Sequence, residues 1–179
     1  MNTGNKIFFN ILSHDRSEKA DHLHRIFLEL GVNFACGIPC GVLKHIIKNF
    51  DNDVTVLHVT VNRESEAVGL AAGAYLGGKT PLVYMQNSGL FSASNDIASL
   101  LVPYEIPIFF VVSYRGCEGE DAVQHLTTGG ATETLLQSFG LPYVVFRGQN
   151  LETLIRSMFE EMRRVKRPTF LLLKRGWHR

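Results

Sequence analysis

Short apolar runs alternate with amphipathic or mixed segments along the chain. Upstream of the first run, apolar residues recur at helical spacing from Ala20 to Leu30, which predicts a helix. Ser17 can cap the start of this helix and Gly31 can end it. Strands that are apolar nearly throughout are buried on both faces, and their alternation with helices implies crossovers between parallel strands. The pattern therefore predicts an α/β fold, an open six-stranded and mainly parallel sheet flanked by helices on both faces. The expected strands read VNFACGI, VTVLHV, PLVYM, IPIFFVV, LPYVVF and PTFLLL.

A length of 179 residues suits a single domain, which we expect to span residues 1–179. Lys and Arg number 18 against 17 Asp and Glu without a long block of one sign, so neither nucleic acid nor a membrane surface is an expected partner. The longest apolar run is too short to cross a bilayer, and the N-terminus lacks a signal-peptide pattern. An odd number of cysteines in a chain too large to need disulfides favours a reducing compartment, the cytoplasm.

Four loops that follow expected strands carry polar or glycine residues. Ligands of open α/β sheets bind outside the carboxyl ends of the strands, so these loops are the first places to look for a site. They are residues 39–41, 60–64, 86–90 and 113–125, which read PCG, TVNRE, QNSGL and SYRGCEGEDAVQH.

Two glutamates, Glu64 and Glu66, stand at the start of an expected helix that is otherwise almost entirely Ala, Gly, Leu and Val. Acidic residues in a first turn offset the partial positive charge of a helix N-terminus by about 0.3 to 1 kcal/mol, which is the simpler explanation of both. Gly69 and Gly73 each cost about 1 kcal/mol relative to Ala in a helix interior, so they suggest close approach by another element. A carboxyl group beside such a contact is poorly solvated and can hold a proton near neutral pH.

The order of these segments resembles the pyrimidine-binding domain of thiamine-diphosphate enzymes, and most of all the sulfopyruvate and phosphonopyruvate decarboxylase group. The likeness runs from GVNFACGIPCGVLKHI through NRESEAVGLAAGAYLGG, YMQNSGLFSASNDIASL and SYRGCEGEDAVQH to RPTFLLLKRG, nearly the whole chain. It implies thiamine diphosphate as the cofactor. It also implies that the Glu64 carboxyl binds the aminopyrimidine ring and so helps the cofactor to lose its thiazolium proton, a catalytic role in which Glu66 has no part.

The QNSGL segment has two readings. From the residues alone it is an ordinary turn, in which Gly89 allows a positive φ and Asn87 or Ser88 bonds local backbone. The resemblance implies instead that Asn87, Ser88, Gly89 and Leu90 bind the cofactor, with the backbone around Ser88 to Leu90 lining its pyrimidine ring and Gly89 permitting close approach.

The polar loop of residues 113–125 is long for this chain, and long loops are often functional, although a surface Arg or His is more often merely solvated. By resemblance, His125 is a catalytic residue that handles protons or binds the substrate anion, and Arg115 and Gln124 are further substrate-binding candidates. Cys40 stands in a turn where many related decarboxylases carry an acidic residue, which makes it another substrate-binding candidate. A cysteine there can equally be a small packed hydrophobe.

The sequence contains no Gly-Asp-Gly triplet, the feature by which the resembled enzymes announce their diphosphate and Mg²⁺ site. We therefore expect no metal ligand in this chain and a partner (beta) subunit that binds the diphosphate and Mg²⁺, in a dimer or hetero-oligomer. The expected reaction is decarboxylation of an anionic 3-substituted pyruvate, with sulfopyruvate giving sulfoacetaldehyde and CO₂. The alternatives are phosphonopyruvate as substrate, or a non-catalytic regulatory or binding subunit that keeps the fold, which Cys40 supports.

Overall fold

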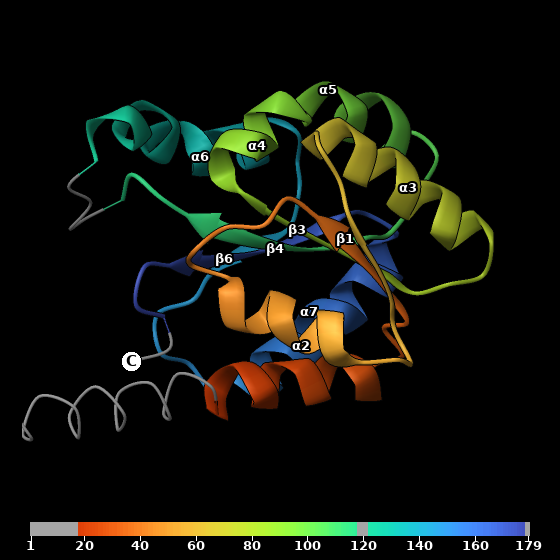
Figure 1. Cartoon of the computed structure of the whole chain (residues 1–179). Helices are drawn as coiled ribbons and strands as arrows, with labels where there is room; N and C mark the ends of the chain where they lie inside the picture. Colours follow the sequence, from red (N-terminus) through yellow and green to blue (C-terminus); the bar gives the residue numbers. More distant parts are fainter. Residues whose placement is uncertain (1–17, 118–121, 178–179) are drawn as a thin grey trace, which may run out of the picture.

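Six parallel strands form the central sheet of the computed structural model, which describes residues 18–117 and 122–177 (Figure 1). Neighbouring strands follow the order β2-β1-β3-β4-β6-β5, and each neighbouring pair is parallel. The strands are β1 (Phe34–Gly37), β2 (Leu57–Thr60), β3 (Pro81–Gln86), β4 (Phe109–Tyr114), β5 (Tyr143–Val145) and β6 (Thr169–Lys174). Each apolar run is thus confirmed as a strand, and within the described ranges the sheet is wholly parallel where a mainly parallel one was predicted.

Helices cover both faces of the sheet. The helix over residues 18–29, α2 and α7 lie below the sheet in Figure 1, whereas α3, α4, α5 and α6 lie above it. Gly31 has a positive φ of 89° just after the first helix, as expected of a helix stop, and the predicted cap Ser17 lies outside the described residues. The bounds are α2 (Lys44–Asn52), α3 (Glu64–Leu76), α4 (Asn87–Ser92), α5 (Ser94–Asp96), the π-helix η1 (Ile97–Leu101), the 3-10 helix η2 (Val123–His125), α6 (Leu126–Ser138) and α7 (Leu151–Val165).

A hydrophobic cluster lies on each face of the sheet. On the upper face Phe110 packs in one cluster with Ala71 of α3 and Leu90 of α4. On the lower face Phe109 stacks on Phe159 of α7, with ring centroids 4.5 Å apart. Neighbouring residues of one strand therefore serve opposite faces, which is why the strands read as continuous apolar runs. No helix among the described residues has both the length and the apolar character needed to cross a membrane.

The strand order reverses between β1 and β3. The chain leaves β1 toward α2, below the sheet, and leaves β3 toward α4, above it (Figure 1). In open parallel sheets this divergence opens the crevice in which ligands bind, outside the carboxyl ends of the two strands. Residues 39–41 and 86–90 follow these two strands, so the topology brings two of the predicted loops to this point.

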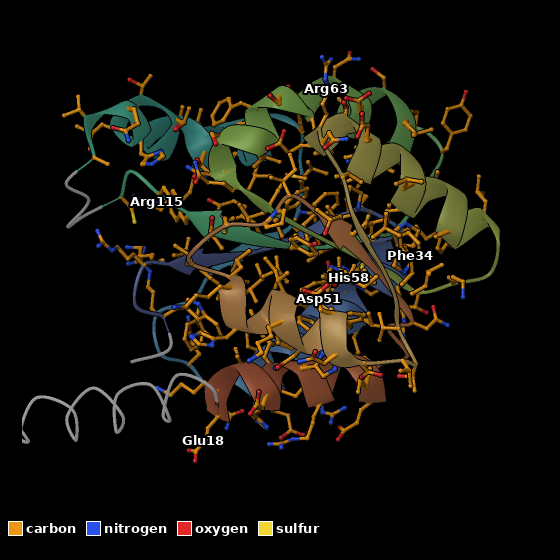
Figure 2. All side chains as sticks on the ribbon, viewed as in Figure 1. Glu18, Phe34, Asp51, His58, Arg63 and Arg115 are labelled. Atoms are coloured by element: carbon orange, nitrogen blue, oxygen red, sulfur yellow. The ribbon has the colours of Figure 1, made fainter. Side chains whose placement is uncertain are left out.

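A chain of polar side chains ties β3 to the edge strand β2. Tyr84 passes over Gly37 of the intervening β1, where a Cβ would stand 2.8 Å from the tyrosine ring. The Tyr84 hydroxyl lies 2.7 Å from Nε2 of His58, and Nδ1 of His58 lies 2.7 Å from Oδ1 of Asp51. Burial raises the pKa of Tyr84 to about 12, so its hydroxyl remains protonated in this chain of contacts. Figure 2 shows Asp51 and His58 on the α2 side of the sheet.

α3 has small or apolar residues on both of its faces. Its buried face consists of Ala67, Val68, Ala71 and Ala72. On its outer face Leu70 is 45% exposed and Leu76 is 75% exposed. Gly69 and Gly73 are exposed as well, and no heavy atom lies within 4 Å of the place where a Cβ would stand on either. The close approach predicted from these glycines is therefore wrong for the described part of this chain, and their outer face is open.

Candidate functional site

The Glu64 carboxyl and Gly89 are in direct contact. Glu64 is the half-buried first residue of α3, and Gly89 is a buried residue of α4. A Cβ on Gly89 would stand 2.2 Å from Oε1 of Glu64 and 2.5 Å from its Cδ, so any side chain at position 89 forces the carboxyl to move. Gly89 has no positive φ, and the QNSGL segment begins a helix, so the turn reading is wrong and the glycine serves close approach.

Glu66 has a different task from Glu64. Its Oε2 accepts hydrogen bonds from the backbone N–H of Asn62 at 3.1 Å and of Arg63 at 3.3 Å, so Glu66 satisfies backbone donors at the start of α3. The Glu64 side chain makes no hydrogen bond or ion pair to any described residue. The helix end is thus capped without Glu64, whose carboxyl remains available to a ligand. Figure 2 labels Arg63 at this end of α3.

Asn87 joins the end of β3 to the end of β4 and to α6. The side chain is fully buried, and its Nδ2 donates to the carbonyl oxygen of Arg115 and to Oγ1 of Thr132, both at 2.9 Å. Its Oδ1 accepts from the backbone N–H of Arg115 at 3.1 Å. Because Arg115 and Thr132 already bond both amide atoms, the Asn87 side chain is not available for the predicted cofactor contact. Leu90, another predicted contact, is 1% exposed in the upper hydrophobic cluster.

Gln86 connects Ser88 and His125. It is the last residue of β3, and its Nε2 lies 2.7 Å from Oγ of Ser88 and 3.4 Å from Nδ1 of His125. Ser88 is exposed and His125 is half-buried. Two residues predicted from separate loops are therefore brought together through a third side chain at the carboxyl end of β3.

Two glycines hold the loop after β4 against the start of α6. Gly116 has a φ of 76°, and a Cβ on it would stand 1.8 Å from the carbonyl oxygen of His125. A Cβ on Gly129 would stand 2.2 Å from the carbonyl oxygen of Gly116. These backbone contacts fix His125 relative to the end of β4, while residues 118–121 of the predicted loop lie outside the described residues. Gln124 is exposed, and Arg115 is half-buried at the end of β4 (Figure 2).

Cys40 reaches the same strand ends from the loop after β1. Its thiol donates to Oγ of Ser113 at 3.3 Å. Ser113 is fully buried in β4, and its register partner in β3 is Gln86. Cys36 differs, because it is fully buried and burial raises the pKa of its thiol to about 12, as for a packed hydrophobe. Cys40 therefore lies at the candidate site, whereas Cys36 belongs to the core.

Two cavities adjoin the carboxyl ends of the strands. One of about 330 Å³ includes Cys40 in its wall, together with the charged residues Lys44, Lys48 and Asp51. The other, of about 620 Å³, lies next to the ends of β5 and β6 and contains none of the predicted site residues. No group of three or more His, Cys, Asp or Glu suited to a metal ion occurs in residues 18–117 and 122–177. The candidate site is thus defined by side chains that converge from several loops, and an enclosed cavity does not mark it.

Gln86 and Ser113 lie in the loops named by the sequence analysis, but neither was singled out as a candidate site residue. Both are polar residues at or next to the carboxyl end of an otherwise apolar strand. Ligands of open parallel sheets bind outside these strand ends. That change from apolar to polar at a strand end is the signal that could have identified them.

No family model matches the chain. The chain is similar to sulfopyruvate decarboxylase subunit alpha of Methanothermobacter thermautotrophicus, with 42% identity over 115 residues that cover 64% of this chain and 70% of that protein. It is also similar to phosphonopyruvate decarboxylase of Streptomyces viridochromogenes, with 41% identity over 60% of this chain and 27% of that protein. Among solved structures, 2-oxoglutarate:ferredoxin oxidoreductase from Magnetococcus marinus has a TM-score of 0.61 over 89% of this chain and 29% of that chain, at 16% identity, a likeness of fold alone.

Proposed function

Because the chain belongs to the family of sulfopyruvate decarboxylase alpha subunits, we propose that it is the pyrimidine-binding subunit of a thiamine-diphosphate-dependent decarboxylase. Its reaction is the loss of CO₂ from an anionic 3-substituted pyruvate, with sulfopyruvate, which gives sulfoacetaldehyde, as the first choice. The observation that carries the proposal is the Glu64 carboxyl, which lies against Gly89 beside the reversal of strand order. A capping role does not explain this carboxyl, since Glu66 already caps α3.

The surroundings of Glu64 fit the aminopyrimidine ring of thiamine diphosphate. The carboxyl is half-buried and without a partner among the described residues, so it can hydrogen-bond a ring nitrogen. The neighbouring backbone of Ser88 and Gly89 carries little side-chain bulk and suits close contact with a flat ring. When bound, thiamine diphosphate supplies the electron sink for the electron pair released with CO₂. The task of Glu64 is to share a proton with the ring nitrogen, and the start of α4 orients the ring.

Substrate handling falls to residues at the ends of β1 and β4. The His125 imidazole can donate a hydrogen bond to the substrate, and Arg115 can pair with a carboxylate or an anionic head group. Gln124 is exposed beside them and is a further contact. Cys40 presents a thiol that donates to Ser113, whereas a carboxylate at the same place would repel an anionic head group.

The proposed assembly contains a second, diphosphate-binding subunit that contributes the Mg²⁺ site. The alpha-subunit designation of the relatives implies a partner, and this sequence contains no Gly-Asp-Gly triplet. The outer face of α3, with Gly69, Leu70, Gly73 and Leu76, is suited to that partner because exposed glycines allow another backbone to approach. The cofactor then lies between the two subunits, near the N-terminus of α3.

Reconstitution tests the proposal. We expect the purified chain to bind thiamine diphosphate and Mg²⁺ weakly in a calorimetric titration, and we expect tight binding and decarboxylation only when the diphosphate-binding subunit is added. Tight binding together with turnover of a 2-oxo acid by this chain alone would show that the two-subunit proposal is wrong. Absence of turnover in the reconstituted complex would favour a non-catalytic binding or regulatory subunit.

Phosphonopyruvate is the second candidate substrate, because the similarity to a phosphonopyruvate decarboxylase extends over 60% of this chain. The two substrates differ in their anionic head group, so the kcat/KM values for sulfopyruvate, phosphonopyruvate and pyruvate separate them. We expect sulfopyruvate to be used best and Arg115→Ala to lower its kcat/KM more than that of pyruvate. Comparable efficiency on all three acids would contradict a dedicated anion contact.

A further inference from the structure

Gln86 is held in place by its surroundings as well as by its own contacts. Its backbone belongs to β3 and pairs with Ser113 of β4, and its side-chain amide bonds Ser88 at 2.7 Å. Asn87, the next residue, is locked between β4 and α6. The amide that faces His125 is therefore held by the strand pairing of Gln86, by its bond to Ser88 and by the fixed position of Asn87.

The chemistry of that amide determines which nitrogen of His125 carries the proton. An amide nitrogen donates hydrogen bonds and accepts none, and the amide nitrogen of Gln86 faces Nδ1 of His125 at 3.4 Å. Nδ1 must then be the acceptor, so the proton of the neutral imidazole lies on Nε2. Within the described chain Nε2 of His125 makes no hydrogen bond. The N–H group at Nε2 is therefore not engaged by any described residue and can donate to a ligand.

We propose that Gln86 is a positioning residue that fixes neutral His125 as its Nε2–H tautomer, so that His125 meets an anionic 2-oxo acid as a hydrogen-bond donor. The assignment of His125 to the substrate rests on the proposed function, whereas the tautomer rests on the contacts of Gln86 alone. The two backbone contacts of Gly116 and Gly129 support the arrangement, because they hold the backbone of His125 against the loop after β4. Gln86 thereby acts through His125, as the orienting partner of a histidine in other active sites does.

Nitrogen NMR of the full chain labelled with ¹⁵N in its histidine rings tests the tautomer directly. The chain has seven histidines, so the signals of His125 are assigned by their loss in His125→Gln. We expect the Nε2–H form in the wild type at a pH where the ring is neutral. Gln86→Glu replaces the donor by a carboxylate that only accepts, so we expect the proton of His125 to move to Nδ1. Gln149→Glu is the matched control, because Gln149 accepts a bond from the Arg147 N–H and does not contact His125.

Either of two NMR results overturns the proposal: an Nδ1–H form in the wild type, which means that the Gln86 amide has the opposite orientation, or an unchanged tautomer in Gln86→Glu. Kinetics of the reconstituted enzyme then test the role of the tautomer. We expect Gln86→Glu to lower kcat/KM at least roughly tenfold and the double variant with His125→Gln to be no worse than His125→Gln alone. A switched tautomer with full activity would remove His125 from substrate handling while leaving the structural inference intact. A switched tautomer with additive losses would show that Gln86 acts independently of His125.

Discussion

α3 and α7 are long helices of one molecule that meet their surroundings in opposite ways. The outer face of α7 carries ion pairs at 2.9 Å between Arg156 and Glu152 and at 2.6 Å between Arg164 and Glu161. The outer face of α3 carries glycines and exposed leucines, and its acidic residues are confined to the first turn. The charged outer face of α7 is thus suited to contact with water, as expected of an amphipathic surface helix. The apolar outer face of α3 is instead suited to contact with another protein, which we propose to be the partner subunit.

The first turns of the two helices also differ in whether their glutamate has a partner on its own helix. Each contains a glutamate, Glu64 in α3 and Glu152 in α7. Glu152 bonds Arg156 one turn later, the usual arrangement on a solvated helix, whereas Glu64 bonds no described residue and touches Gly89. An acidic residue at a helix N-terminus is therefore informative only when its partners are known, because the favourable interaction with the helix dipole is common to both.

The largest expected effect is on activity and belongs to Glu64. Glu64→Gln should lower kcat/KM of the reconstituted decarboxylase by about 100-fold or more, since the amide cannot exchange a proton with the cofactor ring. Exchange of the thiazolium proton, followed by NMR, should slow to a similar degree. Glu152→Gln, in the first turn of α7, is the control and should leave both rates unchanged. Equal exchange rates in Glu64→Gln and wild type would rule out the assigned role.

Gly73→Ala should have effects of opposite sign on the isolated chain and on the assembly. The isolated chain should gain about 0.5 to 1 kcal/mol in the free energy of unfolding, because Ala is the better helix former and nothing stands near its Cβ. Association with the partner should weaken by about tenfold if a backbone packs closely there.

Chemical denaturation and sedimentation measure the two effects of Gly73→Ala separately. Ser157→Ala on the exposed face of α7 is the control, and it should leave association unchanged. Unaltered association in Gly73→Ala would place the partner elsewhere.

A smaller effect is expected at Asp53, at the end of α2 in the lower layer. Hydrogen bonds from Thr55 and from His24 lower the pKa of the Asp53 carboxyl. A carboxyl whose folded-state pKa lies below its unfolded value, about 3.9, stabilises the fold above that pH and loses this contribution as the pH falls through the folded-state pKa. Asp53→Asn should therefore be less stable near neutral pH and unfold with a shallower dependence on acid. Identical acid titrations of both proteins by circular dichroism would contradict this.

The smallest effect should come from the ion pairs of α7. Arg156→Ala removes contacts to Glu152 and Glu29 that lie at the surface, where solvent and salt screen them. We expect a slight loss of thermal stability at low ionic strength that disappears in high salt, without change in association. A loss that persists in high salt would show that Arg156 contributes through packing of its aliphatic stem.

The sequence predicted the six strands because each is a compact apolar run, and it separated Glu64 from Glu66 through the resemblance. It could not give the order of the strands, which depends on contacts between distant segments. Of its two readings of QNSGL, the turn is wrong: Asn, Ser and Gly favour turns locally, whereas the buried bonds of Asn87 to Arg115 and Thr132 favour a helix start. Gln86 was not singled out within its loop, because its contact is with His125 from another loop.

The glycines show why composition alone misleads. Gly69, Gly73, Gly89 and Gly129 all lie in helices, yet only the last two are required by neighbouring atoms of the described chain. The proposed roles of Glu64, Gly89 and His125 stay predictions for the experiments above.

The contact between Glu64 and Gly89 also limits how this protein can evolve. Every amino acid other than glycine adds at least a Cβ, so no substitution at position 89 is a small step: each places a carbon where the Glu64 carboxyl lies. The carboxyl is the end of a flexible side chain, so such variants should still fold and accumulate in the cell while losing the geometry of the site. If Glu64 has the proposed role, selection at position 89 therefore acts on activity rather than on stability, and a lineage that gives up Gly89 leaves a stable fold free to take another role.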